Sequence, residues 1–168
     1  PLFRDLAAHG CIDLTVFFCS DEGVSGADVK TAYGADDTWG MEDGLLEGYR
    51  YKFLRNYSPF GSYLRSLIGL LNLGIWNEFS RERPDAVIIM SWMNPTWWMA
   101  LLVCRIFNVP MLLMTDANVS AERLKKPWKT LIKRWLLGKA LFRVTKGFLC
   151  AGTANQQLYK YFGVPETT

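Results

Sequence analysis

The chain has 168 residues, of which 50% are hydrophobic, and a formal net charge of +3 at neutral pH. This composition excludes disordered and fibrous chains and suffices for one ordinary hydrophobic core, so a single domain over residues 1–168 is expected. The most apolar stretch, residues 92–109, is interrupted by two asparagines, a proline and an arginine. It is too broken for the roughly 20 apolar residues of a membrane span.

The amino-terminal residues predict a helix followed by a strand. Residues 1–10 (PLFRDLAAHG) form an amphipathic turn and a half closed by Gly10, a natural left-handed stop, and they lack the apolar region of a signal peptide. Residues 12–19 are a β-rich apolar run, typical of a strand buried on both faces. A sheet domain that begins with a helix is expected to have lost the strand before it, so the chain is expected to be a fragment.

Residues 20–47 differ from the rest of the chain. They contain eight acidic residues, one lysine and five glycines, which predicts a long surface loop. Such an acidic, glycine-rich loop is either a mobile functional loop or a solvated, variable one. The sequence leaves both interpretations open.

Two further elements are predicted before the next proline-marked strand. Residues 48–55 alternate aromatic and basic side chains, which is typical of a strand at an exposed edge. Residues 63–83 keep their apolar side chains at helical spacing, and Pro84 ends that helix.

From Pro84 onward, strands and helices alternate. We predict a strand over 84–90, a helix over 95–107, a strand over 109–115, a strand over 147–152 and a helix over 153–162. A helix between two short buried strands is the crossover that parallel pairing requires. The sequence therefore predicts an α/β fold with a doubly wound, mostly parallel, Rossmann-like sheet and helices on both faces.

Polar residues follow the predicted strands where each strand ends. Because the carboxyl ends of parallel strands open on one edge, where open α/β sheets bind ligands, these residues are candidates for a binding site. The candidates are Ser91, Trp92, Asn94, Asp116, Asn118 and Thr153, with Thr96 and Asn155 close by in the sequence.

The cysteines carry no metal or disulfide signature. They have no CxxC spacing and lie in apolar strand or helix patterns, so we interpret them as reduced core residues and predict no metal site. A cytoplasmic compartment is expected. The four are Cys11, Cys19, Cys104 and Cys150.

Four segments resemble the amino-terminal domain of retaining GT-B glycosyltransferases of the group-1 or family-4 class. The most specific is residues 151–165 (AGTANQQLYKYFGVP), a small-residue turn, a short helix and a Gly-Val-Pro exit. The other three are residues 1–10 (PLFRDLAAHG), 84–89 (PDAVII) and 107–116 (FNVPMLLMTD). The resemblance spans nearly the whole chain outside residues 20–47.

This resemblance implies the first half of a GT-B fold without its first strand and that strand's glycine-containing loop. The absent carboxyl-terminal domain would hold most of a nucleotide-sugar co-substrate, and no cofactor or metal is implied. The full-length protein would be a hexosyltransferase that moves a sugar, with retention of configuration, to a hydroxyl of a glycan or lipid-linked acceptor. This fragment alone is expected to be inactive. No GxGxxG or GxxxxGK[ST] motif supports another nucleotide-binding enzyme.

Within this resemblance the strand-end residues are acceptor-binding candidates, and no catalytic residue is assigned. Asp116 lies where many family members carry a histidine, and its carboxylate either binds an acceptor hydroxyl or caps the next segment. Trp92 either stacks on a sugar or fills the interface between sheet and helix. Thr153 and Asn155 either meet substrate or serve the helix start, with N-capping by Thr153 favoured.

Residues 122–146 are strongly basic, with nine cations against one acid and a stripe of tryptophan, leucine and phenylalanine. The segment is either a solvated helix whose stripe packs on the sheet or a surface for an anionic membrane. Nucleic acid is not expected, because no RNA- or DNA-binding motif accompanies the charge. The alternative function is therefore a non-catalytic membrane-surface module, peripheral on the inner face of the membrane. Its candidate residues are Lys125, Lys126, Lys129, Lys133 and Arg134.

Overall fold

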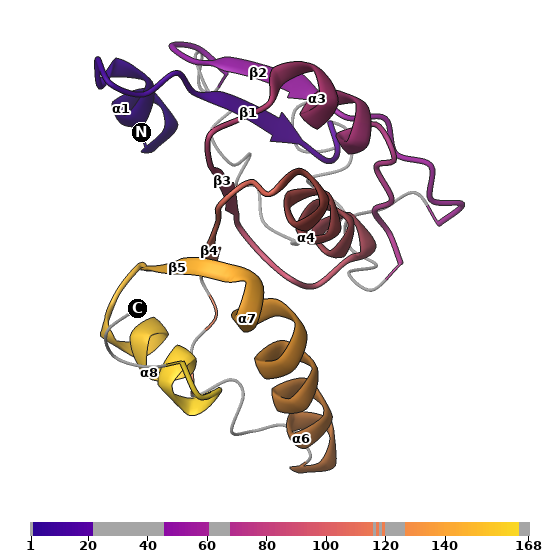
Figure 1. Ribbon diagram of the computed structural model, residues 1–168, viewed down its shortest axis with the longest axis vertical. Coiled ribbons are helices and arrows are strands. Elements are labelled where there is room, and N and C mark those ends of the chain that lie inside the picture. The colour runs from indigo at the N-terminus through magenta and orange to yellow at the C-terminus, as the bar shows by residue number, and fades with distance from the viewer. Residues whose placement is uncertain are drawn as a thin grey trace, which may run out of the picture. The chain divides into compact units, whose positions relative to one another are not determined.

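The computed structural model describes residues 2–21, 46–60, 68–115, 117, 119 and 127–164. It is an α/β protein whose strands pair in parallel in two small sheets (Figure 1). By contacts the chain divides into two units, residues 1–75 with 94–96, and residues 76–93 with 97–168. That residues 1–168 form one domain stays a prediction.

The first unit holds a helix and a two-stranded sheet. Helix α1 (Leu2–Ala8) precedes strand β1 (Thr15–Phe18), which pairs in parallel with β2 (Arg50–Phe53). All four residues of β2 are exposed, which confirms the exposed strand predicted over 48–55. The strand predicted over 12–19 is shorter than expected and half-buried rather than buried, because this sheet has only two strands in the described part of the chain.

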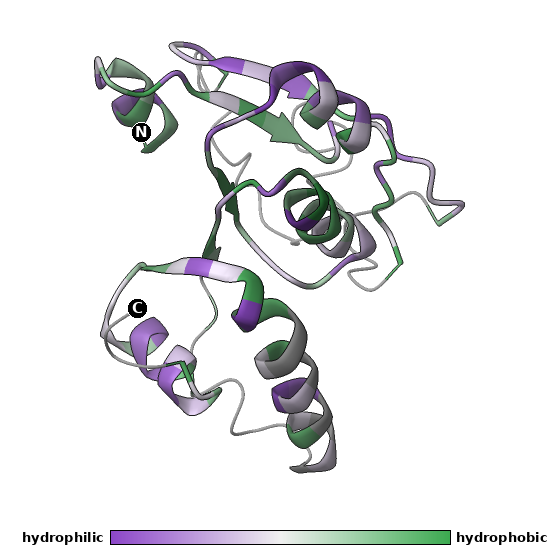
Figure 2. Cartoon of the chain, viewed as in Figure 1, coloured by the Kyte–Doolittle hydropathy of each residue, from purple (hydrophilic) through white to green (hydrophobic). Residues whose placement is uncertain are grey.

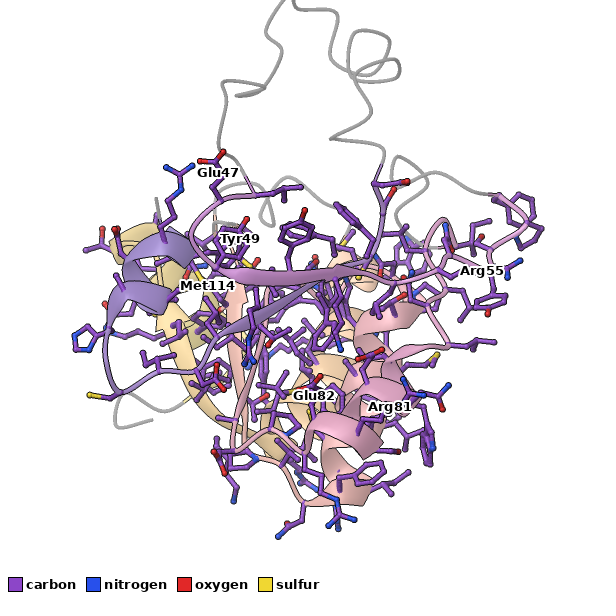
Figure 3. The ribbon with its side chains drawn as sticks, turned by 90° about the horizontal axis from the view of Figure 1, so that it is seen from above. Glu47, Tyr49, Arg55, Arg81, Glu82 and Met114 are labelled. Atoms are coloured by element: carbon purple, nitrogen blue, oxygen red, sulfur yellow. The ribbon has the colours of Figure 1, made fainter. Side chains whose placement is uncertain are left out.

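Aromatic side chains cover one side of this small sheet. Phe18 stacks on Phe53 with ring centroids 5.3 Å apart, and Tyr51 packs edge-on against both rings. Tyr49, labelled in Figure 3, continues the row and packs against Phe3 of α1 at 5.5 Å. These contacts fix α1 to the sheet. Gly10, which was expected to be left-handed, does not have a positive φ angle.

A buried asparagine closes the ends of both strands of this sheet. The Asn72 side-chain amide donates to the carbonyls of Cys19 and Leu54, each at 2.9 Å, just beyond the ends of β1 and β2. Its Oδ1 accepts from the Thr96 hydroxyl at 2.7 Å, and that hydroxyl accepts from the Asn72 backbone N–H at 3.1 Å. Both residues are fully buried. We call this pair the Asn72–Thr96 node.

The prediction of a helix over residues 63–83 is wrong for residues 68–74. Helix α3 covers only Ile75–Glu82, and residues 68–74 are not helical. The Asn56 side chain holds part of that stretch by hydrogen bonds with the backbone of Gly69 and Leu71. The hydrogen bonds between Asn72 and Thr96 hold the next residue. The helix stops before Pro84 as expected, with Arg83 at a φ of 44°.

The second unit is built on a three-stranded parallel sheet in the order β3-β4-β5. The strands are Val87–Ile89, Met111–Thr115 and Thr145–Cys150. The central strand β4 alternates buried and half-buried residues, and Met111 and Leu113 lie in the core. Figure 2 shows β3 and most of α4 in the hydrophobic colour.

Helices connect these strands as parallel pairing requires. Helix α4 (Pro95–Phe107) joins β3 to β4 and has the bounds that the sequence predicted. Helix α6 (Pro127–Leu136), a π-helical turn η1 (Leu137–Leu141) and α7 (Phe142–Val144) follow one another as one column into β5 (Figure 1). Helix α8 (Thr153–Tyr161) is followed by Phe162 and Gly163, and the φ of +93° at Gly163 confirms the predicted glycine cap.

The cysteines are all free thiols, but two of them are not core residues. Cys104 is buried and Cys19 is half-buried, whereas Cys11 and Cys150 are exposed. Cys11 follows α1 in a turn, and Cys150 is the last residue of β5, where it pairs with Thr115 but stays exposed. Their expected core placement is wrong.

In the stretches that the structure places, no helix has the length and apolar character needed to cross a bilayer.

Candidate functional site

The carboxyl edge of the β3-β4-β5 sheet gathers the polar residues that follow each strand. Because the three strands are parallel, their carboxyl ends at Ile89, Thr115 and Cys150 lie at one edge. One hydrogen bond links two of these positions directly, since the Asn155 side-chain N–H donates to the Ala117 carbonyl at 2.8 Å. This contact fixes the start of α8 to the end of β4.

Ser91 serves the local backbone. It is half-buried, and its hydroxyl oxygen accepts a hydrogen bond from the Met93 N–H at 3.3 Å. This is the short side-chain turn that serines often form where a strand ends. The hydroxyl hydrogen of Ser91 is not used in this bond.

Trp92 is buried and has an unpaired donor. It is 7% exposed, and its indole Nε1 has no hydrogen-bond partner among the residues that the structure describes. Its carbonyl accepts from the Trp98 indole N–H at 3.2 Å. The Lys133 ammonium lies 5.3 Å from the centre of the Trp92 ring. The ring is buried under Lys133, and the indole N–H is a polar group of Trp92 that lacks a partner among the described residues.

Asn155 is the second buried residue with an unused polar atom. It is 5% exposed, and its Oδ1 is unpaired within the described part of the chain while its amide N–H binds Ala117. A buried carboxamide oxygen without a donor is costly, by about 1–3 kcal/mol. Such an atom is therefore a candidate for contact with a ligand hydroxyl.

Tyr159 lies one helical turn from Asn155 and was not predicted as a site residue. Burial raises the pKa of its hydroxyl well above the ordinary value, Cys150 raises it further, and a hydrogen bond with Asn155 lowers it in part. The hydroxyl is therefore protonated at neutral pH, and it donates to the Leu113 carbonyl of β4 at 3.5 Å. The spacing of four residues on one helix is the sequence signal that pairs it with Asn155.

Thr153 does not cap its helix as the sequence favoured. It is the exposed first residue of α8, the N-cap is Gly152, and no side chain caps the helix there. Gly152 is extended, with a φ of 170°, so the turn into α8 leaves the Thr153 side chain outside the capping position. Its hydroxyl stays a candidate for ligand contact.

The remaining acceptor-site candidates belong to the first unit or lie outside the described residues. Asn94 belongs to the first unit, where it is 8% exposed with an Oδ1 that is unpaired among described residues. Thr96 is part of the Asn72–Thr96 node and has a structural role. Asp116 and Asn118 lie outside the described residues.

The basic candidates are only partly described. Lys125 and Lys126 lie outside the described residues, and the Lys129 side chain is not described. Lys133 is half-buried, with its ammonium near the rings of Trp92 and Phe162, at 5.3 and 5.5 Å from their centres. Arg134 is exposed.

Among the described residues, no group of three or more histidine, cysteine, aspartate or glutamate side chains is placed to hold a metal ion. No family model, curated protein or solved structure matches the chain. The inference of function therefore depends on the residues and their geometry.

Proposed function

We propose that this chain is the acceptor-side domain of a retaining glycosyltransferase. The full-length protein would move a sugar from a nucleotide-sugar to a hydroxyl of a glycan or lipid-linked acceptor. This proposal includes the doubly wound, Rossmann-like architecture of the first half of a GT-B fold. The parallel order β3-β4-β5 with helical crossovers is compatible with it.

The observation that supports this function best is a pair of buried, unpaired polar atoms at the carboxyl edge of the sheet. Trp92 Nε1 is a donor and Asn155 Oδ1 is an acceptor, and both lack partners in the described part of the chain. A hydroxyl can accept one hydrogen bond and donate another. An acceptor rich in hydroxyl groups therefore has the chemistry that these two atoms need.

In the proposed reaction this domain binds and orients the acceptor. The indole N–H of Trp92 would hold an acceptor oxygen, and the Asn155 carboxamide oxygen would accept from a hydroxyl. Holding the reacting groups in place removes part of the entropic barrier to transfer. Charge that develops on the leaving diphosphate would be stabilised by the second domain of the full-length protein.

The test is product formation by the full-length protein. It is incubated with a panel of UDP-, GDP- and ADP-sugars, with and without monosaccharide and lipid-extract acceptors, and release of nucleoside diphosphate is measured. We expect release that one donor supports and one acceptor class accelerates, with the anomeric configuration retained by NMR. Absence of release with every donor and acceptor would overturn the proposal.

A further inference from the structure

Helix α6 exposes three large apolar side chains. Trp128 is 58% exposed, Leu131 69% and Trp135 60%. At 3.6 residues per turn these three positions fall within about 60° of one another around the helix. They form one continuous face, which we call the Trp-Leu-Trp face.

This face points away from the packed side of the helix. Thr130, Lys133 and Leu137 lie on the other side of the helical column, where Thr130 and Leu137 are buried and Lys133 reaches the rings of Trp92 and Phe162. The two sets are separated by about half a turn. The stripe predicted from the sequence is therefore divided: Phe142 packs against Phe148 of β5, as one of the two interpretations expected, whereas the Trp-Leu-Trp face is exposed. The helix is held by one side and presents tryptophan and leucine on the other.

The positive charge of this part of the sequence favours an anionic partner. Residues 122–146 contain nine cations and one acid, and Arg134, next to Leu131 around the helix, is exposed. A second copy of this segment would meet it with charge of the same sign. Anionic lipid headgroups have the opposite charge, and tryptophan side chains favour the boundary between headgroups and acyl chains.

We propose that α6 lies flat on an anionic lipid bilayer with the Trp-Leu-Trp face inserted at the boundary between headgroups and acyl chains. The exposed Arg134 beside this face contacts the headgroups. Lys133 makes no such contact, because its ammonium lies over the two rings on the inner side. This surface does not depend on the proposed transferase activity.

The test is co-sedimentation of the full-length protein with vesicles. One set contains phosphatidylcholine alone, and the other contains equal parts of phosphatidylcholine and phosphatidylglycerol. We expect binding to the anionic vesicles and little to the neutral ones. In the double variant Trp128→Ser/Trp135→Ser, the affinity for anionic vesicles should fall by about tenfold or more, because the inserted apolar area is lost.

A matched control separates insertion from general surface hydrophobicity. Ile106 on α4 is 54% exposed, similar to the replaced residues. Ile106→Ser should leave vesicle binding unchanged, whereas Leu131→Ser should weaken it. Circular dichroism confirms that each variant is folded, as expected for substitutions at exposed positions.

Two further measurements test the charge contact and the insertion of the tryptophans separately. Arg134→Glu should weaken binding at low salt and have less effect at high salt, because the headgroup attraction is screened. Bromine-labelled lipids should quench tryptophan fluorescence in the unmodified protein and less so in the double variant. Unchanged vesicle binding by the double variant, equal binding to neutral vesicles, or self-association that the double variant abolishes would each overturn the proposal.

Discussion

The two sheets of this protein use asparagine at their carboxyl ends in opposite ways. In the first unit, Asn72 is fully buried, both of its amide hydrogens bind carbonyls, and its Oδ1 accepts from Thr96. In the second unit, Asn155 is also buried, but only its amide N–H is paired with a described residue. A buried polar residue with every atom paired holds structure together, whereas one with an unused atom is available for a ligand.

The largest effect is expected at Asn72, whose side-chain polar atoms are all paired. Asn72→Ala should lower the free energy of unfolding by about 3 kcal/mol, because it leaves buried carbonyls of Cys19 and Leu54 without donors. The measurement is urea unfolding followed by circular dichroism. Asn77, an exposed residue of α3, is the matched control, and Asn77→Ala should change stability by less than about 0.5 kcal/mol. Equal losses of stability in the two variants would show that the Asn72–Thr96 node has no structural role.

The role of Asp116, which lies outside the described residues, can be tested through activity. In the full-length protein, Asp116→Ala should reduce sugar transfer about tenfold more than hydrolysis of the donor, if the carboxylate binds the acceptor hydroxyl. Both rates are obtained from nucleoside diphosphate release with and without acceptor. Equal losses in the two reactions would show that Asp116 has a structural role only.

The indole N–H groups of Trp92 and Trp98 allow a direct comparison. The Trp98 N–H donates to the Trp92 carbonyl, whereas the Trp92 N–H is unpaired among described residues. Benzothienylalanine keeps the ring shape and replaces the N–H by sulfur. At position 98 it should cost about 1 kcal/mol of stability, and at position 92 it should cost nothing or stabilise slightly.

The same replacement also reports on the acceptor. At position 92 it should raise the KM for the acceptor by about tenfold and leave donor hydrolysis unchanged, because one hydrogen bond to the acceptor is lost. A stability loss at position 92 as large as that at position 98 would show that the Trp92 N–H is already bonded within the protein.

The sequence predicts the elements of the second unit better than the polar interactions of the first. Pro95 marks the start of α4, and Asn108, with a φ of 55°, marks its end, so the helix over 95–107 could be read from local chemistry. The non-helical stretch before α3 could not. It depends on Asn72 meeting Cys19, Leu54 and Thr96, and these contacts join residues distant in the sequence.

The candidate site shows the same division. Its position at the edge of a parallel sheet follows from the order of strands and helices, so Trp92 and Asn155 could be named from sequence. Which of their atoms are paired depends on neighbours from other elements, such as Ala117 and Trp98. The exposure of the Trp-Leu-Trp face was also not predictable, because the sequence places it in one stripe with Phe142, which lies beyond the π-helical turn η1 and packs on Phe148.

Thiol labelling gives the smallest effect and compares the two sheet ends without altering the fold. Burial raises the pKa of Cys19, whose carbonyl binds the node, to about 11, whereas Cys150 is exposed at the end of β5. In a Cys11→Ser background at pH 8, Cys150 should react with iodoacetamide at least about tenfold faster than Cys19, because the thiolate is the reactive form. Peptide mass spectrometry after timed quenching measures both rates.

The raised pKa of Cys19 also makes the stability of the folded chain depend on pH. The folded chain favours the protonated Cys19 thiol, so this contribution is fully present below the unfolded pKa of 9.0 and is lost as the pH rises toward about 11. Burial also raises the pKa of the Cys104 thiol to about 11, which changes stability with pH in the same direction. Cys19→Ser should therefore reduce the loss of stability between pH 9 and 11. In the labelling experiment described above, equal rates for Cys19 and Cys150 in the folded chain would show that the two thiols are equally accessible.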